Sequence, residues 1–310
     1  MIDTIAIFSN IFTIGLPTLA IGADLSSLLA SPLHMAILII IGFVVGTAVG
    51  ASGIGGAALI VPSLLFLGVS PQAMVGASLL FNFCTKILGT ILHSKHRNIS
   101  WRAFIYVIIT VAPSMVLASW VWTGIKDNFG TDILDVVILF SVGILLVCIS
   151  VFMVKKHVLR KKGTQSEEAE AVEVPKNFSK GDKTTLLSIG GLVSFMMTIS
   201  SVGAGTILVP VLLKVVKSPK HVAGISMIFG LVASILGSVL HYSLGELPIY
   251  LVAFLLAGSL PGVTLGVKIA STTRPRKLTF IFSIIILVAG LLILQRGLAL
   301  EIVTSFLNIF

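Results

Sequence analysis

Gly50-Ala-Ser-Gly-Ile-Gly-Gly56 interrupts a long hydrophobic segment that extends from Leu33 to Gly68. The segment has 36 residues and would be about 54 Å long as one helix. About 20 residues are enough to cross the hydrocarbon core of a bilayer. Glycine has no Cβ, so it allows the chain to turn tightly and a ligand to approach the backbone closely. The stretch therefore predicts a helical hairpin that bends inside a membrane.

The whole chain has the composition of a membrane protein. Of its 310 residues, 56% are hydrophobic and 11% are charged, whereas soluble domains are about 45–50% apolar and about 25% charged. Further apolar stretches, such as Phe104–Trp122, Ile133–Val154 and Leu278–Leu294, approach the length of a span. We therefore predict an all-α, polytopic transmembrane protein, located as a multi-pass protein in the cell (inner) membrane.

The formal charge of +9 does not indicate a nucleic-acid partner. Basic residues cluster at the ends of apolar segments, for example at Lys95, Arg102 and Arg274. This placement agrees with the positive-inside rule rather than with a nucleic-acid patch. Both cysteines, Cys84 and Cys148, lie within apolar stretches. We therefore expect no disulfide framework, no metal site and no cofactor.

The chain contains an internal repeat with an offset of 148 residues. From Ser52 to Pro113, 17 of 62 positions are identical to the residue 148 positions later. Shared apolar composition would not match glycine, proline and histidine in order. The matched pairs include Gly55 with Gly203, Pro62 with Pro210, Pro71 with Pro219, Ser78 with Ser226, Gly89 with Gly237 and His93 with His241.

The charges of two turns predict that the halves have opposite orientations. The turn at residues 68–71 is uncharged and should be outside, whereas its counterpart at residues 214–220 carries three lysines and should be inside. Each half then needs a broken helical hairpin, the second bent at residues 200–205, which gives two inverted-topology repeats. The predicted division is 1–32, a membrane-associated or spanning N-terminal segment; 33–154, repeat 1; 155–183, a polar cytoplasmic linker; 184–296, repeat 2; and 297–310, a C-terminal tail.

The two glycine-rich breaks are candidate anion sites. A helix that begins near Ala57 leaves its first N–H groups without intrahelical partners, at the positive end of the helix dipole. The same argument applies after Ser200-Ser-Val-Gly-Ala-Gly205. Close packing of helices through small residues is the alternative interpretation. Two breaks at equivalent positions favour a site. The candidate residues in the breaks are Ser52, Gly53, Gly55 and Gly56 in the first, and Ser200, Ser201, Gly203 and Gly205 in the second.

The helix after the first break adds a polar face. Ser78, Asn82, Lys86 and His93 fall on one side of this helix, and Ser226 is the counterpart of Ser78. An ionisable residue inside an apolar span is costly and usually functional. Lys86 is therefore a substrate-binding candidate, although its long side chain can also reach the interface.

Two histidines, His93 and His241, are candidates for gating or proton-linked roles. Both lie near helix ends, where an ordinary interfacial histidine is the alternative interpretation. No carboxylate is expected deep in a span, where it could form a proton or sodium relay. The membrane potential can drive an anion outward instead, since each negative charge gains about 2.3 kcal/mol per 100 mV.

The residues from Gly53 to Pro62, the Ser70-Pro71 turn and Ala73-Met-Val-Gly-Ala-Ser-Leu79, repeated in weaker form, resemble the sulfite exporter TauE/SafE family. The resemblance covers residues 36–296. It implies a transporter that moves sulfite, thiosulfate or an organosulfonate, commonly outward. The second half departs from the pattern, because it has Ser-Val-Gly-Ala-Gly205 at the break and Gly-Ile-Ser-Met227 after the turn. We therefore expect an asymmetric site.

Two other functions stay open at this point. An anion channel could use the same scaffold, since a fold does not fix how its gates open. Gly50-Ala-Ser-Gly53 is also similar to the nucleophile motif of rhomboid-like intramembrane serine proteases, with Ser52 as the nucleophile. The duplication argues against an enzyme. The expected partners are a small anionic substrate and the lipid bilayer, and a homo-oligomer is compatible with the sequence.

Overall fold

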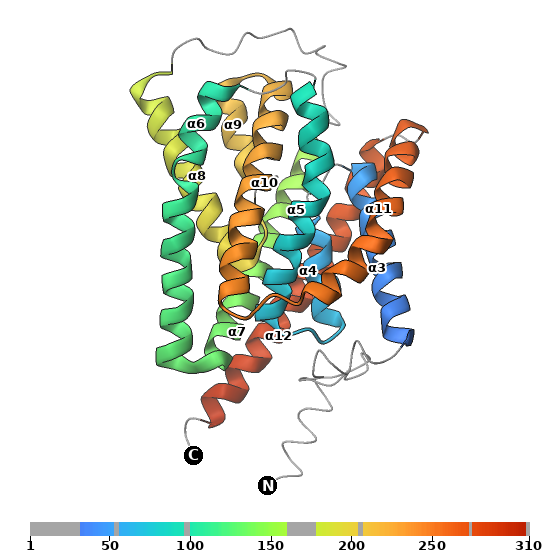
Figure 1. Ribbon diagram of the computed structural model, residues 1–310, viewed down its shortest axis with the longest axis vertical. Helices are drawn as coiled ribbons and strands as arrows, with labels where there is room; N and C mark the ends of the chain where they lie inside the picture. Colours follow the sequence, from blue (N-terminus) through green and yellow to red (C-terminus); the bar gives the residue numbers. More distant parts are fainter. Residues whose placement is uncertain are drawn as a thin grey trace.

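A computed structural model describes residues 32–52, 56–95, 100–159, 178–203, 207–272 and 275–307. The described chain is all-helical (Figure 1), which confirms the predicted fold class. Its helices are α3 (Pro32–Ser52), α4 (Ala57–Phe66), α5 (Pro71–Lys95), α6 (Trp101–Ile108), α7 (Val111–Leu159), α8 (Lys180–Ser200), α9 (Leu208–Val216), α10 (Pro219–Ser243), α11 (Ile249–Thr272) and α12 (Pro275–Leu307).

Six helical stretches of the described chain are long and apolar enough to cross a membrane. They are Pro32–Gly50, Trp101–Lys155, Lys180–Ser200, His221–Ser243, Ile249–Gly266 and Phe280–Glu301. The second of these is 55 residues long and reverses direction at Gly130, where φ is 85°. Glycine adopts this positive φ without a steric penalty. Figure 1 shows the two arms of α7 running in opposite directions from this bend.

Each predicted break separates two helices. α3 ends at Ser52 and α4 begins at Ala57, while α8 ends at Ser200 and α9 begins at Leu208. In Figure 1, α8 runs from one end of the molecule into its interior, and α9 runs back to that end. α3 and α4 run into the interior and back from the opposite end. The chain therefore bends at both positions that the sequence singles out.

Equivalent glycines in the two halves make equivalent contacts. Gly42 of α3 lies against the backbone carbonyl of Leu255 in α11. Gly190 of α8, 148 residues after Gly42, lies against the backbone carbonyl of Val107 in α6, 148 residues before Leu255. The packing partners are thus exchanged between the halves. These contacts support the predicted repeat.

The uncharged turn at residues 68–71 and the lysine-bearing turn at residues 214–220 lie at opposite ends of the molecule. The α4–α5 connection is at one end, together with the bend at Gly130, and the α9–α10 connection is at the other (Figure 1). We call the first the Gly130 end and the second the linker end, because α8 begins there after the predicted linker. α5 and α10 pack together between the two ends. Inverted repeats require the two turns to lie at opposite ends, as they do here. The inverted topology itself stays a prediction.

Several predicted segments lie partly outside the described residues. These are the N-terminal segment up to residue 31 and residues 160–177 of the predicted linker. Gly53, Gly55 and Gly205 also lie outside the described residues. Within the region assigned to the C-terminal tail, α12 continues to Leu307. The divisions between segments stay predictions.

The crossing of α3 and α11 should not tolerate a side chain at Gly258. A Cβ there would overlap with the carbonyl oxygen of Ile39 and lie 2.8 Å from the amide nitrogen of Phe43. Gly258→Ala should therefore destabilise the protein by about 1–3 kcal/mol, seen as a lower thermal midpoint in detergent. Gly124→Ala is the control, because nothing lies within 4 Å of a Cβ at that position. Equal midpoints for the two variants would contradict the packing described here.

The inverted orientation can be tested by side-specific labelling. Single cysteines at Gly68 and Lys217 should react with a membrane-impermeant thiol reagent from opposite faces of right-side-out vesicles. The native Cys84 and Cys148 must first be replaced by serine, since Cys148 is exposed. If both engineered cysteines reacted from one face, the inverted topology would be wrong.

Candidate functional site

A hydrogen bond between two buried hydroxyls joins the halves at the second break. Ser78 of α5 and Ser201, directly after α8, are 0% and 1% exposed, and their Oγ atoms contact each other. Ser78 Oγ also donates to the carbonyl of Val75 at 3.0 Å. Because a hydroxyl carries one proton, Ser78 must accept from Ser201. The Ser201 proton therefore lies in the bond to Ser78, and Ser201 would have to give up this bond to donate to a ligand.

The second break is stabilised by local hydrogen bonds. Ser201 has a left-handed backbone conformation, with φ at 56°, and its N–H donates to the carbonyl of Met197 at 2.8 Å. This conformation ends α8. Ser200 Oγ donates to the carbonyl of Met196 at 2.7 Å. Gly203, with φ at 150°, accepts a 3.1 Å bond from the N–H of Ile207, where the chain enters α9.

Asn82 of α5 lies next to the start of α4, the helix that follows the first break. Its side chain is 2% exposed, and its Oδ1 atom has no hydrogen-bond partner in the described structure. A Cβ at Gly56, the N-cap residue of α4, would be 3.2 Å from this oxygen. An unpaired buried polar atom costs about 1–3 kcal/mol. The unpaired atom is an acceptor, so Asn82 could donate to an anion at this place only after its carboxamide rotates to present the NH2 group.

Lys86 directs its ammonium group into the protein. Its Nζ atom lies against Gly230, in the space that a Cβ at this position would occupy. Gly230 is in the middle of α10 and is the counterpart of Asn82 in the repeat. The ammonium therefore stays within the helix bundle and does not extend toward the end of α5. Among the described residues, Lys86 forms no ion pair.

His241 is enclosed by protein near the end of α10. It is 0% exposed, its Nε2 atom is 3.0 Å from the carbonyl oxygen of Thr198, and its ring contacts Trp122 edge to face at 4.7 Å. Thr198 belongs to α8 and Trp122 to α7. His241 is therefore covered by protein and not exposed at the surface of the bundle. A gating or proton-linked role stays a hypothesis.

The structure describes the other predicted site residues in part. Ser226 is buried on α10, with 7% exposure. The side chains of Ser52 and His93 lie outside the described residues. No group of three or more His, Cys, Asp or Glu residues that could hold a metal ion occurs in the part of the chain that is described.

The sequence analysis missed a polar cluster at the Gly130 end. Lys126 Nζ and Glu246 Oε1 form an ion pair at 2.5 Å. Gln72 Nε2 donates to Asp135 Oδ1 at 3.0 Å. The sequence shows several charged residues around Gly130. Their spacing does not indicate that Gln72 and Glu246, which are distant in the sequence, contact them.

Arg296 was also missed. Its guanidinium donates to the carbonyl of Leu65 at 3.0 Å, in the last turn of α4. A cation at the C-terminal end of a helix is favourable because the dipole is negative there. The bond holds α12 against the C-terminal end of α4, the short helix whose N-terminus lies next to Asn82.

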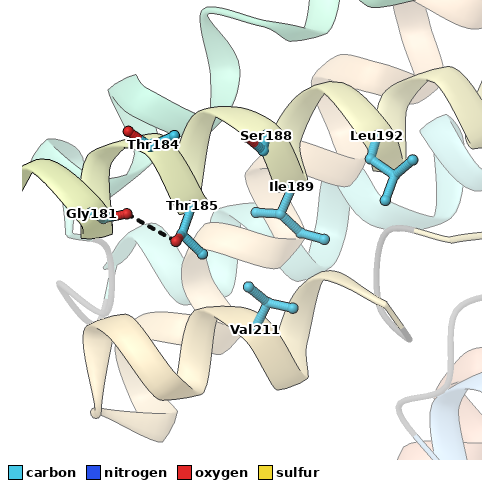
Figure 2. Close-up of a pocket in the computed structure, with 7 residues that line it drawn as sticks. All are labelled: Gly181, Thr184, Thr185, Ser188, Ile189, Leu192 and Val211. Atoms are coloured by element: carbon cyan, nitrogen blue, oxygen red, sulfur yellow. Dashed lines mark hydrogen bonds between the residues drawn. The ribbon is translucent and has the colours of Figure 1, made fainter.

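A hollow of about 520 Å³ lies elsewhere, between α8 and α9 (Figure 2). Thr185, Ile189 and Leu192 of α8 extend toward Val211 of α9, and Leu192 is 52% exposed. The lining is mostly apolar. The residues that line this hollow do not include Ser78 or Ser201, so it is separate from the candidate site.

Known proteins with similar sequences are named as membrane transporters. "Probable membrane transporter protein YjnA" of Bacillus subtilis is 28% identical over 257 residues, which cover 82% of this chain and 97% of the relative. "Probable membrane transporter protein YunE" of the same organism is 25% identical, covering 84% and 97%. "Probable membrane transporter protein MJ0441" of Methanocaldococcus jannaschii is 26% identical, covering 84% and 96%. No solved structure matches the chain.

The match to a family covers most of the chain and both halves. Residues 38–293 match the family described as Sulfite exporter TauE/SafE. This range includes both breaks, α5 and α10. It agrees with the resemblance seen in the sequence. The chain therefore belongs to the TauE/SafE sulfite exporter family of membrane proteins.

Proposed function

We propose that this protein exports a small sulfur-containing oxyanion, such as sulfite, thiosulfate or an organosulfonate, through a central site between the two breaks. The observation that carries the proposal is the contact between Ser78 of the first half and Ser201 of the second-half break. Asn82 and Lys86 lie one and two helical turns further along α5 from Ser78. The proposed site would therefore take its hydrogen-bonding groups from both halves, with Ser201 as the contribution of the second half.

The chemistry of these groups favours an anion. The Ser201 hydroxyl, the Asn82 carboxamide and the Lys86 ammonium can all donate hydrogen bonds, and α4 begins beside Asn82. Hydrogen bonds to a charged group contribute about 1.5–3 kcal/mol each. A small anion with several oxygen atoms could therefore be held mainly by hydrogen bonds and not by apolar contacts. The sulfur-containing class comes from the family alone.

Alternating access follows from the proposed repeat. In inverted-repeat transporters, substrate sites lie near the membrane centre, between broken helices that meet from opposite faces. The exchanged contacts of Gly42 and Gly190 and the opposite positions of the two turns (Figure 1) support this arrangement. Movement of one half against the other would then expose the site to each side in turn.

The proposed direction is outward across the cell (inner) membrane, with the linker end in the cytoplasm. The lysine-bearing α9–α10 connection lies at the linker end (Figure 1), as the positive-inside rule requires of a cytoplasmic face. A cell that is negative inside gives each exported negative charge about 2.3 kcal/mol per 100 mV. No coupled cation is then needed for export.

Flux of radiolabelled sulfite, thiosulfate and a sulfonate into proteoliposomes tests this function. The double variant Ser78→Ala/Ser201→Ala should raise the half-saturation concentration about tenfold, the loss of roughly one hydrogen bond to a charged ligand. Ser283→Ala is the matched control, because Ser283 is also buried but bonds within its own helix, to Phe280 at 2.7 Å. Saturable flux that is stimulated by substrate on the opposite side would indicate a transporter. A channel would show flux without this stimulation.

Replacement of Lys86 tests the charge of the site. Lys86→Gln should reduce anion flux at least about tenfold, the loss expected when a charged hydrogen-bond partner is removed, while Lys86→Arg should keep part of it. If Lys86→Gln transported like the parent, the ammonium would have no part in binding.

A further inference from the structure

The Gly130 end of the bundle is closed by polar contacts between three elements. Lys126 in the first arm of α7 pairs with Glu246 in the connection between α10 and α11. Gln72, in the first turn of α5, bonds to Asp135 in the second arm of α7. The Glu246 side chain is 10% exposed, and Gln72 is 7% exposed. These contacts hold the bend of α7 and the α10–α11 connection against the start of α5.

The connection packs directly on α5. A Cβ at Gly76 would be 2.5 Å from the carbonyl oxygen of Glu246 and 3.3 Å from Cβ of His241. The N–H of Glu246 also donates to the carbonyl of His241 at 2.9 Å. The position of Glu246 is therefore linked to that of His241 through both backbone and packing.

Two further layers continue from the ion pair to the candidate site. His241 contacts Trp122, one helical turn from Lys126 in α7, and bonds to Thr198 in α8. Ser201 follows Thr198 by three residues and contacts Ser78. Trp122 is 1% exposed. The described side chains thus form a packed column from the Gly130 end to the two serines.

We propose that the Lys126–Glu246 ion pair is the latch of the gate at the Gly130 end, and that His241 and Trp122 are its inner layer. The proposal rests on the alternating-access function above. When the site opens toward the Gly130 end, the α10–α11 connection must leave α5 and the ion pair must break. His241 moves with this connection and releases Thr198, so the gate is linked to the second break.

The charges around the latch favour this assignment over a purely structural one. Exposed ion pairs contribute little to stability, and a partly buried acid without a partner is costly. Lys126 pairs with Glu246, and the Asp135 carboxylate interacts with the charges of Glu246, Asp132, Lys126 and Arg296, so the ion pair belongs to a group of three carboxylates and two cations. Loss of the pair during the transport cycle exposes both charges to water at this end, which lowers the cost of opening.

Side-specific accessibility of the site tests the latch without a known substrate. In a chain with Cys84 and Cys148 replaced by serine, a cysteine at Ser201 is labelled by an impermeant reagent applied at the Gly130 end. Glu246→Gln should increase this labelling rate about fivefold, as expected for an ion pair of modest strength. Asp127→Asn is the matched control, because Asp127 follows Lys126 directly, is exposed and should not change the rate.

The charge-reversed pair separates a latch from a change in folding. Lys126→Glu alone should increase labelling, and Lys126→Glu/Glu246→Lys should restore the slow rate of the parent. Labelling from the linker end should not rise in any of these variants. Equal rates in Glu246→Gln and Asp127→Asn would overturn the proposal. So would a double variant that is labelled as fast as Lys126→Glu.

A cross-link distinguishes failure of the gate from failure of the proposed function. Cysteines at positions 126 and 246, joined by a short bifunctional reagent, should abolish thiosulfate counterflow, and equilibrium binding of radiolabelled thiosulfate should persist from the linker end. Unimpaired counterflow after cross-linking would disprove the latch and leave the transport function intact. Absence of thiosulfate, sulfite and sulfonate binding in the uncrosslinked parent would disprove the substrate, while the labelling rates still decide on the latch.

Discussion

Each helix break inside a membrane has to be covered by protein, because lipid cannot satisfy the backbone groups that a break leaves unpaired. The second break meets this requirement through Ser200 and Ser201. One hydroxyl bonds to the backbone of its own helix, and the other bonds across to Ser78 of α5. The central helices must therefore carry polar, small residues at the level of the breaks. The packing of the central helices, the position of the candidate site and the contacts of the proposed gate all depend on this constraint.

The two halves share this constraint but satisfy it differently. At equivalent positions, α5 has Asn82 where α10 has Gly230, and the glycine leaves room for the ammonium of Lys86. A symmetric arrangement would put two amides or two glycines at the centre. The observed one puts a cation and a carboxamide on the same helix, α5, and leaves α10 to provide space. This difference supports an asymmetric site, which stays a proposal.

The sequence predicted those features that depend on local chemistry. Both breaks, the start of α4 at Ala57 and the polar face of α5 follow from glycine content, helix length and helical periodicity. The direction of the Lys86 side chain did not follow, because one sequence allows both an inward and an interfacial conformation. The enclosure of His241 did not follow either. Its distance from the helix end suggested an interface, but the α10–α11 connection and Trp122 cover it.

Contacts between elements that are distant in the sequence could not be predicted, because each residue of such a pair looks like an ordinary surface residue in its local sequence. Lys126 and Glu246 are 120 residues apart and both look like solvated loop charges. Their pairing depends on the close approach of Glu246 to α5, which requires the absence of a side chain at Gly76. Gly76 is matched by Gly224 in the repeat, but the position equivalent to Glu246 is Asn98. Because a carboxylate at this position occurs in one half only, the proposed latch would give the two directions of opening different free energies.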